Sequence, residues 1–151
     1  MLLFEKPENL IETFNINCLG PMLVTKELLK GMIKSKQGSI VFIGSAVAHY
    51  GGVGKSFYGA SKSALYGFIQ SISKELGRAN IRVNSVSPGY IETKLTENFS
   101  AVELDKTISA ISLRRGGKAE EVSGLINFLL SEDSGYITGE DIKIDGGMTL
   151  W

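Results

Sequence analysis

Residues 39–44 have the sequence SIVFIG, a short apolar run typical of a buried β-strand. A Gly-rich loop follows at residues 51–54, and a helical pattern then runs over residues 57–76. A second strand is predicted at residues 81–87, where a Pro-Gly pair ends it. Strands that alternate with helices of this length predict an α/β fold with a parallel sheet.

The rest of the chain continues this alternation. A first helix is predicted over residues 7–34, because Pro7 suits the first position of a helix. Residues 96–112 are expected to form one or two short, mobile helices, and residues 119–130 a further helix. Residues 141–145 alternate in polarity and predict a third strand.

The helix at 57–76 carries two different stripes. One stripe is large and mostly apolar: Tyr58, Lys62, Leu65, Ile69, Ile72 and Leu76. The opposite stripe is small: Ala60, Ala64, Gly67 and Ser71. A large apolar stripe suits packing on a sheet, and a small one suits close approach by another helix. We therefore expect cover on both sides, the second of which a partner subunit could supply.

Composition excludes several classes of function. The 151 residues are enough for one domain, and 16 acidic side chains balance 16 basic ones, which argues against a nucleic-acid binder. No apolar run reaches the roughly 18 residues that span a bilayer, and no signal-like segment opens the chain. A single cysteine, Cys18, excludes an internal disulfide and predicts a cytoplasmic protein; we expect it to be a small apolar helix residue.

Tyr58 and Lys62 form the candidate acid–base pair. Residues at i and i+4 share one face of a helix, and a nearby cation favours the phenolate and lowers a tyrosine pKa from about 10. Such a tyrosine can exchange a proton with a hydroxyl or carbonyl near neutral pH. Taken alone the pair has a structural reading as well, since a tyrosine and a lysine often meet at this spacing.

Pro21 lies four residues after Asn17, inside the first predicted helix. Proline has no N–H, so the Asn17 carbonyl loses its usual helical donor. We expect a kink here, with a carbonyl that is able to bind water. His49, the only histidine, is expected to be a solvated loop residue.

Several motifs occur in one order along the chain, and together they resemble the short-chain dehydrogenase/reductase family. They are Asn17-Cys18-Leu19-Gly20, Ile43-Gly44-Ser45, Tyr58-Gly59-Ala60-Ser61-Lys62, Arg82-Val83-Asn84, Pro88-Gly89-Tyr90-Ile91-Glu92-Thr93, Ile137-Thr138-Gly139 and Asp145-Gly146-Gly147. Within the family, the pattern from Arg115 onward is most similar to the 3-oxoacyl-(acyl-carrier-protein) reductases.

The resemblance implies catalytic roles. Tyr58 is expected to be the general acid/base, and Lys62 to lower its pKa and bind the nicotinamide ribose. Ser45 is expected to hold the substrate oxygen, and Asn17 a water that links Lys62 to solvent. The cofactor, NAD or NADP, would lie against Tyr58 and Lys62 and against a second set of residues: Pro88, Gly89, Ile91 and Thr93.

The same resemblance implies that part of the family pattern is missing. The Gly-rich phosphate loop and the residue that selects NAD or NADP do not occur in this sequence. We expect a single truncated domain over residues 1–151, the C-terminal part of a Rossmann-like doubly wound sheet, with family strands 5 to 7 and an open edge at 39–44. Self-association through helices 7–34 and 57–76 is expected to cover exposed apolar surface.

Two functions follow. The first is NAD(P)-dependent oxidoreduction of a small-molecule carbonyl or alcohol. The alternative is a cofactor-deficient fragment that keeps only the association surface and is inactive alone.

Overall fold

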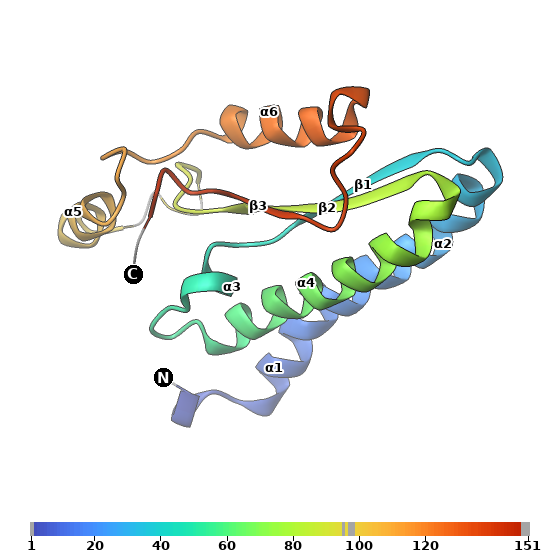
Figure 1. Ribbon diagram of the computed structural model, residues 1–151. Coiled ribbons are helices and arrows are strands. Elements are labelled where there is room, and N and C mark those ends of the chain that lie inside the picture. The colour runs from blue at the N-terminus through green and yellow to red at the C-terminus, as the bar shows by residue number, and fades with distance from the viewer. Residues whose placement is uncertain (1, 95, 97–98, 149–151) are drawn as a thin grey trace.

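The computed structural model describes residues 2–94, 96 and 99–148. Its centre is a parallel sheet of three strands in the order β1-β2-β3, formed by β1 (Gly38–Ile43), β2 (Ile81–Pro88) and β3 (Asp141–Ile144). Helix α6 covers one face, and α2 and α4 lie on the other (Figure 1). The predicted α/β fold with a parallel sheet is confirmed, and the carboxyl ends of all three strands meet at one edge.

The first predicted helix is present with a change of winding. It comprises α1 (Pro7–Phe14), a π-helical turn (Asn15–Leu19) and α2 (Gly20–Ser35). Because Pro21 has no N–H to donate to residue 17, the normal i→i−4 ladder is interrupted there, and the turn immediately before it is widened. The kink expected from Pro21 is therefore found as a π-helical turn that contains Asn17.

Helix α4 (Ser56–Leu76) covers the sheet as its apolar stripe predicts. Its inward residues join side chains from β1 and β2 in the main core: Phe42, Leu65, Ile69, Ile72, Leu76, Ile81 and Val83. The Phe42 and Phe68 rings meet edge to face at 6.0 Å. Gly67, on the opposite stripe, is exposed and a Cβ there would meet nothing within 4 Å.

Three shorter helices complete the fold. α3 (Val47–Tyr50) follows β1 and was not predicted, because four residues are too few to show a helical period. Among the described residues of 96–112 there is one α-helix, α5 (Ala101–Ser109), which Ser100 and Glu103 begin with a reciprocal capping box. α6 (Ala119–Leu130) has the predicted bounds.

Strand β1 is less buried than its sequence predicts. Phe42 is buried, but Ile43 is 44% exposed, and Ile40 and Val41 are only partly covered. The reason is position, because β2 pairs with one side of β1 and no strand pairs with its other side among residues 2–94, 96 and 99–148. The expected open edge is confirmed, and the expectation of a buried strand is wrong on that side.

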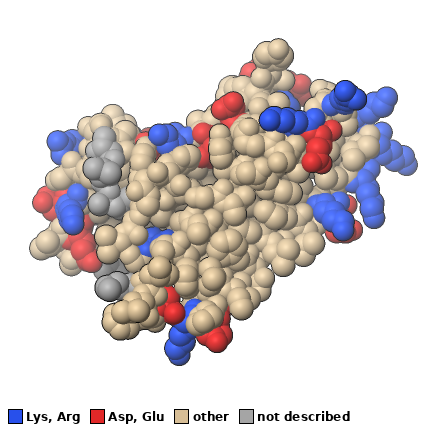
Figure 2. Space-filling model, turned by 60° about the horizontal axis from the view of Figure 1, so that its bottom comes forward, with Lys and Arg blue, Asp and Glu red and all other residues tan. Residues whose placement is uncertain are grey.

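The outward face of α1 and α2 is apolar and uncovered. Its exposed side chains, between 49% and 65% accessible, are Ile11, Ile16, Leu19, Leu23, Val24, Leu28 and Ile33. Figure 2 brings forward the side formed by α1, α2 and α4, which is uncharged through its middle, with Lys and Arg gathered at the end where α2 and α4 finish. Within the described part of the chain, no helix is long and apolar enough to cross a membrane.

Candidate active site

Tyr58 and Lys62 lie on consecutive turns at the start of α4, near the carboxyl edge of the sheet. The Lys62 ammonium is 5.9 Å from the centre of the Tyr58 ring and donates a hydrogen bond of 2.8 Å to the Ile43 carbonyl at the end of β1. Burial lowers the pKa of Lys62, and the nearby Cys18 acts more weakly in the opposite direction. The predicted pair is therefore side by side, with a lysine that releases its proton more readily than usual.

Asn17 is tied to the same helix. Its amide donates to Ser61 Oγ at 3.0 Å, and Ser61 Oγ in turn donates to the Tyr58 carbonyl at 2.7 Å. The buried Cys18 donates from Sγ to the Ser61 carbonyl at 2.8 Å, and burial raises its pKa. Cys18 was expected to be a small apolar helix residue, and it lies buried in the π-helical turn. Ser61 therefore links Asn17, in the π-helical turn, to Tyr58, the candidate acid/base.

Ser45 follows the last residues of β1 and is buried. Its Oγ accepts a hydrogen bond from the Val47 N–H at 3.2 Å, in the first turn of α3. The next residue, Ala46, donates its N–H to the Pro88 carbonyl at 2.9 Å. Ser45 and the Pro88 segment are therefore neighbours at the edge where ligands bind in open parallel sheets.

The segment from Pro88 to Thr93 is held in place by backbone contacts. Gly89 donates its N–H to the Ile144 carbonyl at 3.0 Å, and a Cβ on Gly89 would lie 2.7 Å from Asp145 Cβ, so only glycine fits. Ile91 forms an isolated parallel bridge with Gly117. The Thr93 N–H donates to Thr96 Oγ1 at 2.9 Å.

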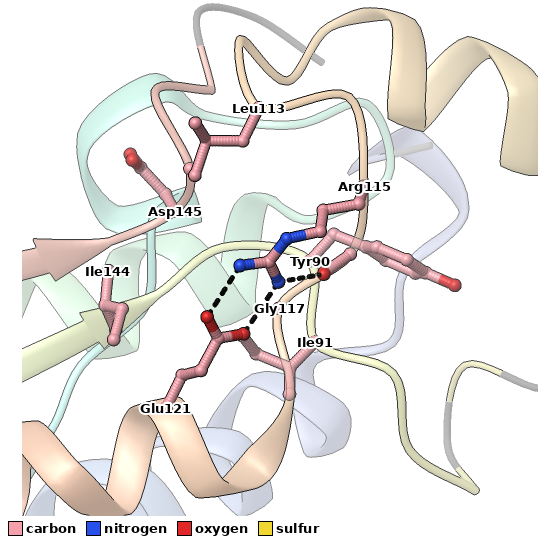
Figure 3. Close-up of a pocket in the computed structure, with 10 residues that line it drawn as sticks. Tyr90, Ile91, Leu113, Arg115, Gly117, Glu121, Ile144 and Asp145 are labelled. Carbon is pink, nitrogen blue, oxygen red and sulfur yellow. Dashed lines mark hydrogen bonds and ion pairs between the residues drawn. The ribbon is translucent and has the colours of Figure 1, made fainter.

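An ion pair that was not predicted from the sequence lies next to the segment from Pro88 to Thr93. Arg115 holds Glu121 through two hydrogen bonds of 2.8 and 2.7 Å, and Figure 3 shows the pair beside Tyr90, Ile91 and Gly117 around a cavity of about 80 Å³. The Arg115 guanidinium, together with the Lys118 N–H, lowers the pKa of Glu121 to about 2. Its sequence signal was a glutamate at the third position of a predicted helix.

His49 is exposed to solvent as expected, but it is not in a loop and its side chain has a partner. It lies in α3, and its Nε2 contacts Asp141 Oδ2 at the start of β3. Asp141 also accepts hydrogen bonds from Ser85 at 2.5 Å and from Ser87 at 2.8 and 2.9 Å. The contact has a topological reason, because the parallel pairing of Ser85 with Asp141 brings this carboxylate within reach of His49 in α3.

A second cavity, of about 370 Å³, lies between α3, the Gly-rich loop and α5. Its lining combines apolar side chains with charged ones, and includes Val47, Val53, Lys55, Phe99, Lys106 and Met148. Val47 is two residues from Ser45, so this cavity adjoins the candidate active site.

Three comparisons with known proteins agree. Residues 3–149 match the family described as enoyl-(acyl carrier protein) reductase. The chain is 45% identical over 150 residues to carbonyl reductase family member 4 of Xenopus laevis, and 42% identical over 150 residues to the 3-oxoacyl-(acyl-carrier-protein) reductase FabG of Thermotoga maritima. Each alignment covers 99% of this chain and 61% of the relative.

A crystal structure assigned as a betaketoacyl-ACP reductase superposes with a TM-score of 0.87 at 33% identity, over 96% of this chain and 61% of that one. The chain thus spans about 61% of the length of these relatives. On the matched residues, the sequence identity and the shared fold, the chain belongs to the short-chain dehydrogenase/reductase family of oxidoreductases.

Proposed function

We propose that the chain carries the proton-transfer part of an NAD(P)-dependent oxidoreductase that interconverts a carbonyl and an alcohol. One observation carries the proposal: Tyr58 and a low-pKa Lys62 lie on one face of α4, at the carboxyl edge of a parallel sheet. That edge is where open α/β sheets bind ligands. Family membership supports the reaction class.

The residues present fit the nicotinamide end of the cofactor. At Gly89 the absence of a side chain lets the backbone pack closely on Asp145 at the carboxyl end of β2. Pro88, Gly89, Ile91 and Thr93 would hold the nicotinamide, while Tyr58 and Lys62 would hold its ribose. When bound, the cofactor supplies the hydride.

The side chains of the chain itself then perform positioning and proton transfer. Tyr58 gives its hydroxyl proton to the carbonyl oxygen during reduction, and Lys62 stabilises the resulting phenolate. Ser45 holds the substrate oxygen by a hydrogen bond, and Asn17 links Lys62 to solvent through a water. The cavity of about 370 Å³ beside Ser45 would receive a small-molecule carbonyl or alcohol, because its walls are mainly apolar.

Substitution of the tyrosine tests this proposal. We expect Tyr58→Phe to lower turnover at least 100-fold, because a positioned acid contributes about 10²–10⁴-fold, while nicotinamide binding is retained. Tyr136→Phe, which alters a fully exposed tyrosine, is the matched control and should keep full turnover. Steady-state reduction of a carbonyl substrate with NADPH or NADH measures the first property, and equilibrium fluorescence titration the second. Undiminished turnover in Tyr58→Phe rejects the assigned role.

A second candidate function is a cofactor-deficient fragment that keeps only an association surface. It is favoured by the uncovered apolar face of α1 and α2, on the side that Figure 2 brings forward. The small stripe of α4 favours it as well, because a Cβ on Gly67 would meet nothing within 4 Å. We infer that two copies associate through helices 7–34 and 57–76. A titration that detects no binding of NADH or NADPH by the chain favours this candidate over the first.

Sedimentation velocity tests the association. The chain is expected to sediment as a dimer or larger oligomer, and Leu28→Lys, which places a charge in the apolar face, is expected to shift it to monomer. Lys30→Glu alters a charge on the same helix without touching an apolar side chain, and serves as control. A chain that is already monomeric at high micromolar concentration contradicts the inference.

A further inference from the structure

A cavity of about 200 Å³, whose wall carries several polar side chains, lies on the flank of α4 that faces α3 and β3. Its lining includes His49, Lys62, Ser63, Tyr66, Ser87 and Asp141. Asn17 approaches α4 from the opposite flank, where it bonds Ser61, whereas Ser63 bonds the Ala48 carbonyl of α3 at 3.0 Å. Asn17 and the cavity therefore lie on opposite flanks of α4, and the cavity residues next to Lys62 have no role in the proposed function.

Lys62 and Asp141 both line this cavity, together with Gly44. Lys62 Nζ bonds the Ile43 carbonyl, and the next residue is Gly44. A Cβ on Gly44 would overlap Ser87 Oγ and would lie 3.4 Å from Asp141 Oδ1. Because Gly44 has no side chain, Ser87 Oγ occupies this position and donates its hydrogen bonds to Asp141.

On the far wall of the cavity, the buried carboxylate of Asp141 contacts His49, which reaches solvent. The Asp141 side chain is only 6% exposed, while that of its partner His49 is 32% exposed. The titratable groups that face the cavity are His49, Lys62, Tyr66 and Asp141. A cavity of this size with several polar partners is able to hold ordered waters, and such waters bridge groups that do not touch.

We propose that this cavity is a proton-exchange route for Lys62 that ends at the His49–Asp141 pair and is separate from the Asn17 side. The inference rests on the proposed function, in which Lys62 supports Tyr58. After Tyr58 has given its proton to the substrate oxygen, the Lys62 ammonium reprotonates the phenolate. The neutral amine then takes a proton from a cavity water, and the water recovers one through His49 from solvent. No electrons are moved in these steps.

NMR on the chain labelled with ¹³C- and ¹⁵N-lysine tests the route without turnover. The Lys62 signals are assigned with Lys62→Arg, and two quantities are recorded: the titration midpoint of Lys62 and the hydrogen-exchange rate of its ammonium. Asp141→Asn is expected to slow the exchange several-fold, because the carboxylate at the far end of the route is lost. Glu140→Gln removes the neighbouring carboxylate, which does not line the cavity, and should change neither quantity.

His49→Gln is the second variant, because it leaves Asp141 and its serine partners in place. It is expected to slow the exchange several-fold. Unchanged exchange in both folded variants overturns the route, and a midpoint shift with unchanged exchange overturns it as well, because Asp141 then acts only as a charge. These readouts do not depend on activity, so the proposed oxidoreductase function can fail in the Tyr58→Phe test while the proton route stands, and the reverse.

Discussion

The two helical segments on the same side of the sheet differ in how far their apolar side chains are buried. In α4 the apolar stripe is covered, and Ile69 and Leu76 are 0% and 7% exposed. In α1 and α2 much of the apolar surface faces outward, and Ile11 and Leu28 are 60% and 58% exposed. Both segments have apolar side chains at helical spacing. The difference shows that periodicity creates an apolar face, while its burial depends on which element packs next to it.

The largest effect is expected from a pair of truncations that compare the two faces. Ile69→Ala should lower the free energy of unfolding by about 2–5 kcal/mol, because it leaves a cavity in a closed core. Leu28→Ala should change it by less than about 0.5 kcal/mol, because the side chain is exposed in the monomer. Urea unfolding at low protein concentration measures both. Equal losses of unfolding free energy in the two variants would mean that the outer face of α2 is buried in solution. That result would contradict the contrast between α2 and α4.

A second pair compares two open glycines in helices. Gly67 of α4 and Gly124 of α6 are both exposed, and a Cβ at either position would meet nothing within 4 Å. Alanine should therefore stabilise the chain by up to about 1 kcal/mol at each position, through helix propensity alone. Thermal unfolding at two protein concentrations checks this.

The stabilisation by alanine should differ between the two positions once the chain self-associates. The gain at Gly124 should be independent of concentration, whereas the gain at Gly67 should shrink as the concentration rises, if α4 meets a second copy closely. Identical behaviour at both concentrations would place the association surface elsewhere.

The smallest effect concerns the ion pair behind the Pro88 segment. The pKa of Glu121 falls from its ordinary value of 4.5 to about 2 in the folded chain, mainly through Arg115. A carboxyl whose folded pKa is depressed stabilises the fold above its unfolded pKa, and this contribution is lost as the pH falls from 4.5 to about 2.

Replacing this carboxyl should therefore change the response to acid. Glu121→Gln should flatten the pH dependence of the unfolding midpoint in that window, by a modest amount because the pair is exposed to solvent. Glu120→Gln, one position earlier on α6, is the control. An unchanged slope in Glu121→Gln would show that the pair contributes nothing to stability.

Local elements were predictable because they depend on neighbouring residues. The bounds of α6 agree with the prediction, and α4 begins one residue earlier than predicted. The kink before Pro21 followed from a missing N–H. The exposure of Ile43 and the short helix α3 were not predictable in this way. The first depends on whether a further strand lies beside β1, and the second is too short for a period.

In the candidate site, too, contacts between sequence neighbours were predictable, and contacts between distant residues were not. The sequence alone places Tyr58 and Lys62 together, because an α-helix brings residues four apart onto one face through local hydrogen bonds. Only the tertiary structure joins His49 to Asp141, which are 92 residues apart, and Asn17 to Ser61, which are 44 apart. These contacts require the parallel register of β2 and β3 and the docking of the π-helical turn on α4. Sequence periodicity carries no information on either, because both are set by packing between distant segments.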